Sequence, residues 1–373
     1  MQVLDLFKLM TSKSASDLFI TVGAPPSLKV DGQVFPVKTD VLTPESSQQL
    51  VDSLMNDAQR QQFETDKEAN FAVNPDGLGR FRVNVFRQQG QAGMVVRRIS
   101  THIPTFEELN LPPAILEKIA MARRGLVLFV GGTGTGKSST QAAMVGYRNH
   151  HTRGHIVTVE DPIEFVHTHD RCIVTQREVG VDTLSYQSAL ENAMRQAPDV
   201  IQIGEIRTPE TMKQAIVFAE TGHLCFATLH ANNTYQALER IVNLHRRPGD
   251  SGTLYMDLSM NLKAIISQRL VPRVTGSGFV PAIEVMLNSP LVSDLILKGQ
   301  IDNIRDAVEK SVDEGMISFD QSVFDLFEKG LISYENAMRN ADSENNLRLK
   351  IKLEGKTAKG QKDLGSTFDQ VEF

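Results

Sequence analysis

The feature that most constrains the fold is a glycine-rich turn that follows an apolar run and precedes a helix-like segment. Residues 126–140 read LVLFVGGTGTGKSST, in which five apolar residues lead into four glycines, a lysine and two serines. Residues 131–138 fit the phosphate-loop pattern G-x-x-x-x-G-K-[ST], and the pattern stands in the right context, after a buried strand and before a helix. The sequence therefore predicts an α/β domain with a phosphate-binding loop.

Each residue type in this turn has a physical reason to be there. Glycines let backbone N–H groups turn inward around phosphate oxygens, and the helix N-terminus adds partial positive charge. Lys137 is expected to reach the β- and γ-phosphates, and the Ser138 hydroxyl is expected to bind Mg²⁺. An ordinary glycine-rich turn is the alternative, but motif and context agree on a site for ATP and Mg²⁺. The predicted nucleotide-binding residues of the loop are Gly131, Gly132, Thr133, Gly134, Thr135, Gly136, Lys137, Ser138 and Ser139.

Apolar runs of strand length alternate with helix-like segments after residue 114. The runs show little alternation between apolar and polar residues, which is typical of a mostly parallel sheet that is covered on both faces. One helix, at 208–221, starts with Thr-Pro-Glu and is followed by Gly222, as capping preferences predict. The predicted strands are residues 126–130, 155–159, 199–203, 224–229 and 280–287.

The first hundred residues predict a smaller α/β domain. Asp31-Gly32 lies between two alternating runs and predicts a type I′ hairpin turn. Thr43 followed by proline and glutamate predicts a helix start, and later strands carry scattered arginines. Three prolines without a sustained period then indicate a linker. The expected organisation is a first domain at 1–100, a linker at 101–113, an ATPase domain at 114–345 and a flexible polar tail at 346–373.

Acidic residues follow two of the predicted strands. Glu205 comes just after the third strand, at the end where ligands of open α/β sheets bind, and is expected to act on Mg²⁺ through water. Glu160, Asp161 and Glu164 come after the second strand. A solvated acidic turn is the alternative for this cluster, but carboxylates beside a phosphate loop suit the water and metal chemistry of ATP hydrolysis.

Two histidines bracket the fourth predicted strand. His230 leaves the strand at the edge where the phosphate loop is expected, next to Thr228, Asn232 and Asn233, so it is a candidate sensor of the γ-phosphate. His223 precedes the same strand and is included, with Glu160 and Asp161, among the predicted nucleotide-binding residues. A satisfied core histidine is the alternative for His230. No metal other than Mg²⁺ is expected, with Ser138 and Glu205 as its protein groups.

Composition narrows the function classes. The chain has 39 basic and 45 acidic residues among 373, a net charge of −6, and no basic stripe interleaved with aromatic residues, which disfavours nucleic-acid binding. No run of about 18 apolar residues is present, so we expect no membrane insertion. Two cysteines, Cys172 and Cys225, and an N-terminal segment without signal-peptide character favour a reduced, cytoplasmic compartment.

Four ordered motifs resemble those of a known family. GGTGTGKSS, VTVEDPIEFVH, APDVIQIGEIR and AETGHLCFATLHANNT resemble the Walker A motif, Asp box, Walker B motif and His box of the secretion and type IV pilus motor ATPases. The resemblance covers residues 1–353 and is strongest to the pilus retraction ATPases PilT and PilU. Assembly and secretion members usually carry a four-cysteine zinc insertion, which two isolated cysteines cannot form.

Other segments resemble the PilU branch more than the PilT branch. PilT proteins carry an Ala-Ile-Arg-Asn-Leu-Ile segment, whereas this chain reads PLVSDLI at 290–296 and lacks the arginine. The segment NLHRRPGD at 243–250 and the longer C-terminal tail also look like PilU. The resemblance therefore implies an accessory role beside a PilT-type paralogue.

The resemblance also implies an architecture and a set of site residues. It implies a PAS-like first domain, a RecA-like P-loop ATPase domain, and a homo-hexamer with the nucleotide between the domains. It implies that Glu164 is the catalytic glutamate, Glu205 the Walker B acid and His230 a phosphate sensor. Arg82 and Arg97 would be arginines supplied by the first domain, whose positive charge offsets charge that builds on the γ-phosphate.

The function implied is a hexameric motor that couples ATP hydrolysis to pilus retraction and twitching motility. Its location would be cytoplasmic and peripheral at the inner membrane, through an inner-membrane platform protein of the pilus machine. A regulatory or scaffold subunit that binds ATP with little hydrolysis is the second reading. A RecA-like nucleic-acid translocase is a third, which the charge balance disfavours.

Overall fold

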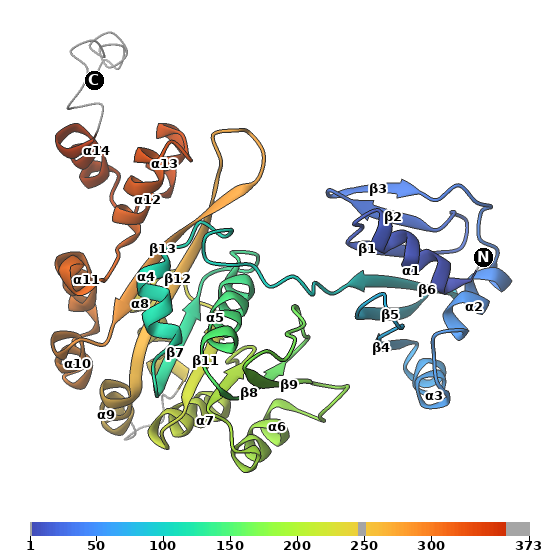
Figure 1. Cartoon of the computed structure of the whole chain (residues 1–373), viewed down its shortest axis with the longest axis horizontal. Coiled ribbons are helices and arrows are strands. Elements are labelled where there is room, and N and C mark those ends of the chain that lie inside the picture. Colours follow the sequence, from blue (N-terminus) through green and yellow to red (C-terminus); the bar gives the residue numbers. More distant parts are fainter. Residues whose placement is uncertain (1, 245–250, 356–373) are drawn as a thin grey trace, which may run out of the picture. The chain divides into compact units, whose positions relative to one another are not determined.

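The computed structural model describes residues 2–244 and 251–355. Most of the segment NLHRRPGD and the end of the expected tail, 356–373, lie outside the described residues. The chain divides into two compact units (Figure 1). The first unit contains the residues up to Ile103 together with Asp161–Thr168 and Gln176–Ser185. The second contains Pro104–Glu160, His169–Thr175 and the chain from Tyr186 onward.

The first unit is built on a six-stranded sheet. The strand order is β3-β2-β1-β6-β5-β4, and neighbouring strands are antiparallel throughout. The strands are β1 (Asp17–Ile20), β2 (Ser27–Val30), β3 (Gln33–Pro36), β4 (Glu68–Val73), β5 (Phe81–Gln88) and β6 (Gln91–Arg98). The helices are α1 (Val3–Ser12), α2 (Pro44–Asp52) and α3 (Asp57–Asp66).

Local sequence explains two of these elements. Asp31 and Gly32 both have positive φ, 48° and 81°, which the type I′ turn between β2 and β3 requires, so the predicted hairpin is confirmed. Thr43 caps α2 by accepting a hydrogen bond from the backbone N–H of Ser46 at 3.2 Å. Inside the unit, the rings of Phe7 and Phe81 stack 4.4 Å apart. This stacking contributes to a core shared by α1 and the sheet.

The second unit is built on a seven-stranded sheet in the order β13-β12-β7-β11-β10-β8-β9. Five neighbouring strands, β12, β7, β11, β10 and β8, run parallel, and β13 is antiparallel to β12. The expected α/β class with a mostly parallel sheet is confirmed. The strands are β7 (Gly125–Val130), β8 (Gly154–Glu160), β9 (Cys172–Glu178), β10 (Val200–Ile203), β11 (Leu224–Leu229), β12 (Leu262–Pro272) and β13 (Phe279–Leu287).

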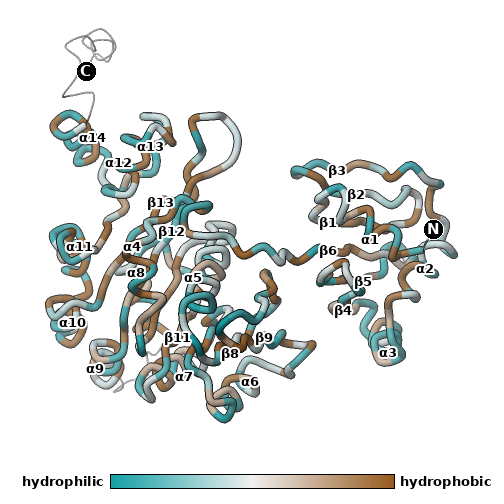
Figure 2. The backbone as a smooth tube through the Cα atoms, viewed as in Figure 1, coloured by the Kyte–Doolittle hydropathy of each residue, from teal (hydrophilic) through white to brown (hydrophobic). Residues whose placement is uncertain are grey.

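Helices and short 3-10 turns connect and cover this sheet. They are α4 (Pro113–Ala120), α5 (Lys137–His151), α6 (Tyr186–Ala193), η1 (Met194–Gln196), α7 (Pro209–Glu220), α8 (Thr234–Leu244), α9 (Ser251–Asn261), α10 (Pro290–Leu297), η2 (Ile301–Asn303), α11 (Ile304–Lys310), η3 (Val312–Glu314), α12 (Phe319–Glu328), α13 (Tyr334–Asn340) and α14 (Glu344–Glu354). All residues of β7 and β11 are buried, which is why these strands read as continuous apolar runs. The apolar residues along the strands can be followed in Figure 2.

The expected linker is shorter than the sequence indicated. Phe106 and Leu111 are buried in the core of the second unit, together with Ile115 of α4, Phe129 of β7 and Met144 of α5. Phe106 and Leu111 lie in a proline-rich segment that has no helical or strand period. For this reason the sequence predicts a linker over the whole of 101–113. Most of that segment, from Pro104 onward, instead belongs to the second unit.

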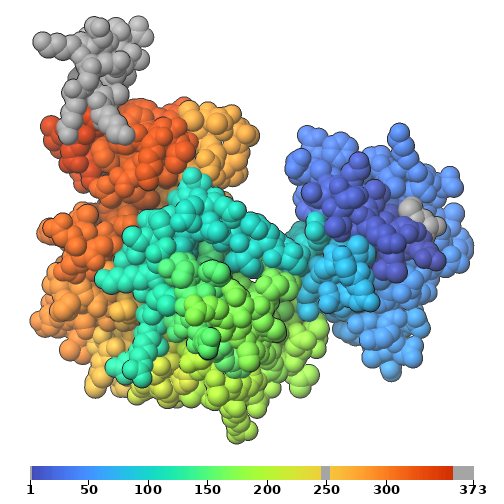
Figure 3. All heavy atoms as spheres, viewed as in Figure 1, coloured from blue at the N-terminus to red at the C-terminus, as the bar shows by residue number. Residues whose placement is uncertain are grey.

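The expected tail is also partly folded. Residues 346–354 belong to helix α14, whose Leu347 and Ile351 are buried in a core shared with α12, α13 and the β12–β13 pair. In the space-filling view the atoms of this C-terminal part, orange-red to red, form one contiguous region (Figure 3). Apolar residues four positions apart lie on one face of a helix, and here that face is buried. The prediction of a flexible tail from 346 was therefore wrong for its first part. No helix among residues 2–244 and 251–355 has the length and apolarity to span a membrane.

Candidate nucleotide-binding site

The glycine-rich loop lies between the last residue of β7, Val130, and the first residue of α5, Lys137. Gly136 precedes the helix in a left-handed conformation, with φ of 87°, so the chain enters α5 through a sharp turn. The Lys137 ammonium donates hydrogen bonds to the backbone oxygens of Gly131 at 3.0 Å and Gly132 at 2.6 Å. The loop therefore surrounds its own lysine at the N-terminus of a 15-residue helix, an arrangement that favours bound phosphate.

The structure brings Glu205 and His230 together. Glu205 lies two residues after the last residue of β10, and its carboxylate contacts His230 Nε2 at 2.9 Å and Arg207 Nε at 2.7 Å. His230 directly follows β11. The strands β10 and β11 both run parallel to β7, and Leu229 at the end of β11 is level with Val130 at the end of β7. Glu205 and His230 therefore lie at the same edge of the sheet as the phosphate loop, as the sequence predicts.

A cavity connects the loop with the residues after β11. Its volume is about 800 Å³, and it is open to solvent. Its lining residues are Gly131, Gly132, His230, Ala231, Asn232, Gln236, Glu239, Arg240, Asn243 and Leu244. A volume of this size is in the usual range for small-molecule sites, about 300 to 1,000 Å³. The cavity can accept a ligand that reaches both the loop and His230.

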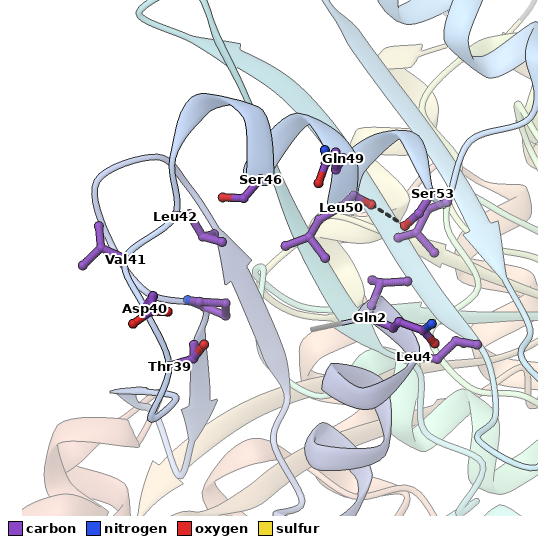
Figure 4. Close-up of a pocket in the computed structure, with 13 residues that line it drawn as sticks. Gln2, Leu4, Thr39, Asp40, Val41, Leu42, Ser46, Gln49, Leu50 and Ser53 are labelled. Atoms are coloured by element: carbon purple, nitrogen blue, oxygen red, sulfur yellow. Dashed lines mark hydrogen bonds between the residues drawn. The ribbon is translucent and has the colours of Figure 1, made fainter.

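A second cavity, of about 640 Å³, lies in the first unit between α1 and α2 (Figure 4). Hydroxyl, amide and leucine side chains line it, among them Thr39, Gln49 and Leu50. Asp40 is the charged residue among its described lining residues, and these include no lysine or arginine. A triphosphate requires positive charge or inward N–H groups, so the cavity beside the loop is the better candidate for the nucleotide.

Glu160 is the last residue of β8 and is buried at the same sheet edge. Its carboxylate accepts a hydrogen bond from the Thr158 hydroxyl at 2.7 Å. The strand β8 lies next to β10, and the backbone N–H of Gly204 donates to the oxygen of Val159 at 2.7 Å. Glu160 therefore lies at the end of the strand that neighbours β10, the strand that Glu205 follows. Asp161 and Glu164 follow it in the segment that groups with the first unit.

His223 lies at the other end of β11. Its ring Nδ1 is 3.0 Å from the Thr221 hydroxyl oxygen, and its backbone oxygen accepts from Gly125 at the start of β7. The six residues of β11 separate it from His230, a span of roughly 20 Å for an extended strand. Residues that bracket a strand lie at opposite edges of a sheet, so within this chain the structure does not bring His223 to the phosphate loop. The position of His223 therefore gives no support to its prediction as a nucleotide-binding residue of this chain's own loop.

The two predicted arginines are cross-strand neighbours in the first unit. Arg82 of β5 is directly opposite Arg97 of β6, so their side chains share one face of the sheet. Arg97 Nε contacts the buried carboxylate of Asp17 at 2.7 Å, while its side chain remains 68% exposed. A surface guanidinium fixed at its base by a buried carboxylate is oriented but still accessible.

Glu164 belongs to the same unit as these arginines, which the sequence did not indicate. Phe165 forms a parallel bridge with Ser100, just beyond β6, and the N–H of Val166 donates to the oxygen of Ser100 at 2.9 Å. Further along, Arg80 pairs with the buried carboxylate of Glu178 at 3.1 Å. The Asp-box segment is thus tied by its backbone to the chain that leaves the arginine hairpin.

Comparison with known proteins identifies the family. A model of the type II/IV secretion system protein family matches residues 10–288. The chain belongs to this family. It is 56% identical over 349 residues to the type IV pilus ATPase PilU of Pseudomonas aeruginosa, a match that covers 93% of this chain and 91% of that protein.

Two further members of the secretion family support the same placement. The type IV pilus retraction ATPase PilT of Pseudomonas aeruginosa is 39% identical over 342 residues, with 91% of this chain and 98% of that protein covered. A crystal structure of the pilus retraction motor PilT with bound ADP has a TM-score of 0.86 at 38% identity and covers 94% of this chain and 99% of that one. The resemblance to the PilT and PilU ATPases, drawn from four motifs, is confirmed.

A buried glutamate near the site of this secretion-family ATPase was missed by the sequence reading. Glu284 of β13 accepts hydrogen bonds from the backbone N–H of Thr234 at 3.0 Å and from the Thr234 hydroxyl at 3.1 Å. Thr234 begins α8, directly after the loop that carries His230. The carboxylate therefore anchors the start of the helix that follows residues 230–233, a segment named the sensor loop after the role predicted for His230. A lone acid within the apolar run 280–287 was the signal in the sequence.

Burial is the main reason why the pKa of Glu284 is raised from 4.5 to about 7; the hydrogen bonds from Thr234 oppose the rise. Because the folded-state pKa exceeds the unfolded one, the folded state binds more protons between these two values. The free energy of unfolding therefore falls as the pH rises from about 4.5 to about 7 and is level, for this group, above and below that window.

We expect Glu284→Gln to remove this part of the pH dependence. In the wild type, Glu284 should lower the unfolding free energy by on the order of 3 kcal/mol between pH 4.5 and pH 8. Chemical denaturation at fixed protein concentration across this range measures it, with the exposed Glu220→Gln as the matched control. An unchanged pH profile in Glu284→Gln would contradict the buried-acid assignment.

Proposed function

We propose that this chain is a motor ATPase that couples ATP hydrolysis to type IV pilus retraction, as a PilU-type accessory to a PilT-type paralogue. The observation that carries the proposal is the contact between His230 and Glu205 at the edge of the sheet that carries the phosphate loop. The chain's 56% identity to a protein named as the pilus ATPase PilU supports the same process. The proposed assembly is a ring of six that acts with the pilus machine at the inner membrane.

The proposed division of labour follows the chemistry of the side chains. Lys137 and the loop N–H groups bind the β- and γ-phosphates. Bound Mg²⁺ would neutralise phosphate charge, and the Ser138 hydroxyl and the Glu205 carboxylate fit it because this ion prefers oxygen ligands. Arg207 and His230 orient the Glu205 carboxylate through contacts at 2.7 and 2.9 Å.

The first unit supplies the remaining groups in this proposal. Glu164 would take the proton of the attacking water, and Arg82 and Arg97 would offset charge on the γ-phosphate. Because all three belong to the unit that does not carry the loop, their approach and withdrawal would couple hydrolysis to movement of that unit. Glu160, Asp161 and Ser139 are proposed to complete the nucleotide site.

Pilus retraction measured in cells tests the proposed function. In a strain that lacks this gene, we expect impaired pilus retraction under load or reduced twitching, restored by the wild-type gene but not by Lys137→Ala, which leaves phosphate charge uncompensated. The same strains are compared with and without the PilT-type paralogue. Full retraction in the absence of this gene, in both backgrounds, would contradict the proposal.

A scaffold subunit with little hydrolysis is the second candidate, favoured by the PLVSDLI segment in place of the PilT pattern. Phosphate release by the purified protein separates the two. We expect release by the wild type and a loss of about 100-fold or more in Glu164→Gln, because general-base catalysis contributes on that order. The exposed Glu191→Gln is the control. Absence of release from the wild type at saturating ATP would favour the scaffold.

Arg97→Ala should lower turnover by about 1,000-fold while leaving ATP affinity largely unchanged, because an arginine finger acts mainly in the transition state. Steady-state kinetics and binding of a non-hydrolysable ATP analogue measure the two quantities. Arg87→Ala is the matched control, since Arg87 lies on the same hairpin but pairs with Glu64 at 3.2 Å. Equal losses of affinity and turnover would argue against the finger role.

A further inference from the structure

Strand β12 runs directly beside the phosphate loop. It pairs in parallel with β7, where Ile266 is level with Phe129 and Ser267 is level with Val130, the last residue before the loop. The next residue of β12 is therefore Gln268, at the level where β7 has become the glycine-rich turn. The side chain of Gln268 is 4% exposed, although it is an amide in the middle of a buried sheet.

Gln268 contacts both ends of the loop. A Cβ atom on Gly131 would stand 2.6 Å from the Gln268 backbone oxygen, and one on Gly136 would stand 2.7 Å from Gln268 Nε2. Real Cβ atoms do not approach other atoms so closely. Glycine is therefore required at Gly131, which meets a backbone oxygen, whereas a side chain at Gly136 would displace the end of Gln268. Gly136 is also in the left-handed conformation that turns the chain into α5.

Gln268 also reaches the first turns of α5. Its Oε1 accepts a hydrogen bond from the Thr140 hydroxyl at 2.6 Å, and both residues are buried. Buried hydrogen bonds of this kind are costly to break because neither partner can find water instead. One side chain thus joins the helix that follows the loop to the strand beside it.

The neighbouring residue of β12 holds the other loop of the site. The Ser267 hydroxyl donates to the backbone oxygen of Asn232 at 3.2 Å, two residues after His230. Side chains of consecutive strand residues point to opposite faces of a sheet. Ser267 and Gln268 therefore tether the sensor loop and the phosphate loop from the two sides of one strand.

We propose that Gln268 is a positioning residue of the nucleotide site, one that sets the backbone of the phosphate loop without touching the nucleotide. The inference rests on the proposed ATPase function and deepens it. A loop whose N–H groups already point inward loses less conformational freedom on binding than a loop that must first rearrange. The predicted consequence of losing Gln268 is weaker ATP binding with turnover at saturating ATP largely retained.

The test compares Gln268→Met, which keeps the length of the side chain but removes both polar atoms, with the wild type. We expect the dissociation constant of a non-hydrolysable ATP analogue, and the KM for ATP, to rise about tenfold, the factor that roughly one lost interaction of this kind produces. The kcat should change less than threefold. Gln321→Met, which removes an amide from α12 that is hydrogen-bonded to Asp325, is the matched control and should change neither.

Thr140→Val provides the second variant, because it removes only the hydroxyl that donates to Gln268. It should weaken nucleotide binding in the same direction, and the double variant should lose less than the product of the two single losses, since both remove one hydrogen bond. Unchanged affinity in both single variants, or a loss that merely follows a lower unfolding temperature, overturns the positioning role. Failure of the wild type to bind or hydrolyse ATP would instead overturn the proposed function.

Discussion

The structure of the site depends on the parallel pairing of four strands. Because β8, β10, β11 and β7 run in the same direction and in register, the residues that follow each of them emerge at one edge of the sheet. The phosphate loop, Glu205 and His230 are far apart in sequence, yet each comes after one of these strands. The pairing converts a linear order of motifs into a single site, which is the general place for ligands in sheets of this kind.

A different constraint orients the first unit's arginines. Their hairpin is antiparallel, so register places Arg82 opposite Arg97, two positive charges on one face. Asp17 is also level with Arg97 on the neighbouring strand β1, and its buried carboxylate binds the guanidinium. One carboxylate beside two guanidinium groups leaves an excess of positive charge among these three side chains, which is compatible with the role toward phosphate proposed for the arginines.

The site residues that could be predicted from the sequence are those that belong to a local sequence pattern. The phosphate loop has a fixed spacing, and Glu205 and His230 follow recognisable strands, so strand direction alone predicted their shared edge. His223 precedes β11, and because β11 is parallel to β7 the start of this strand lies at the edge opposite the phosphate loop, a consequence of strand direction that its inclusion overlooked. The helix α14 was missed because polar composition outweighed Leu347 and Ile351, whose burial depends on a partner surface that only the folded unit provides.

Strand β12 shows most clearly why the remainder could not be predicted. Ser267, Gln268 and Arg269 interrupt the apolar run of this strand, which also carries Lys263 near its start, and these polar residues weaken the pattern of a buried strand. The polar side chains of Ser267 and Gln268 make contacts that exist only in the folded chain. Ser267 contacts the sensor loop, and Gln268 contacts the phosphate loop and α5.

Arg269 completes the series. Its guanidinium pairs with Asp342 at 2.6 Å and lies 3.9 Å from the ring centre of Phe319, at the start of α12. Three consecutive residues of one strand thus contact the sensor loop, the phosphate loop and the C-terminal helices. A displacement of β12 would alter its contacts with the sensor loop, the phosphate loop and the C-terminal helices together, because consecutive residues of a packed strand cannot move independently. The polar interruption that hid this strand from pattern reading is therefore the feature that ties the nucleotide site to the C-terminal part of the unit.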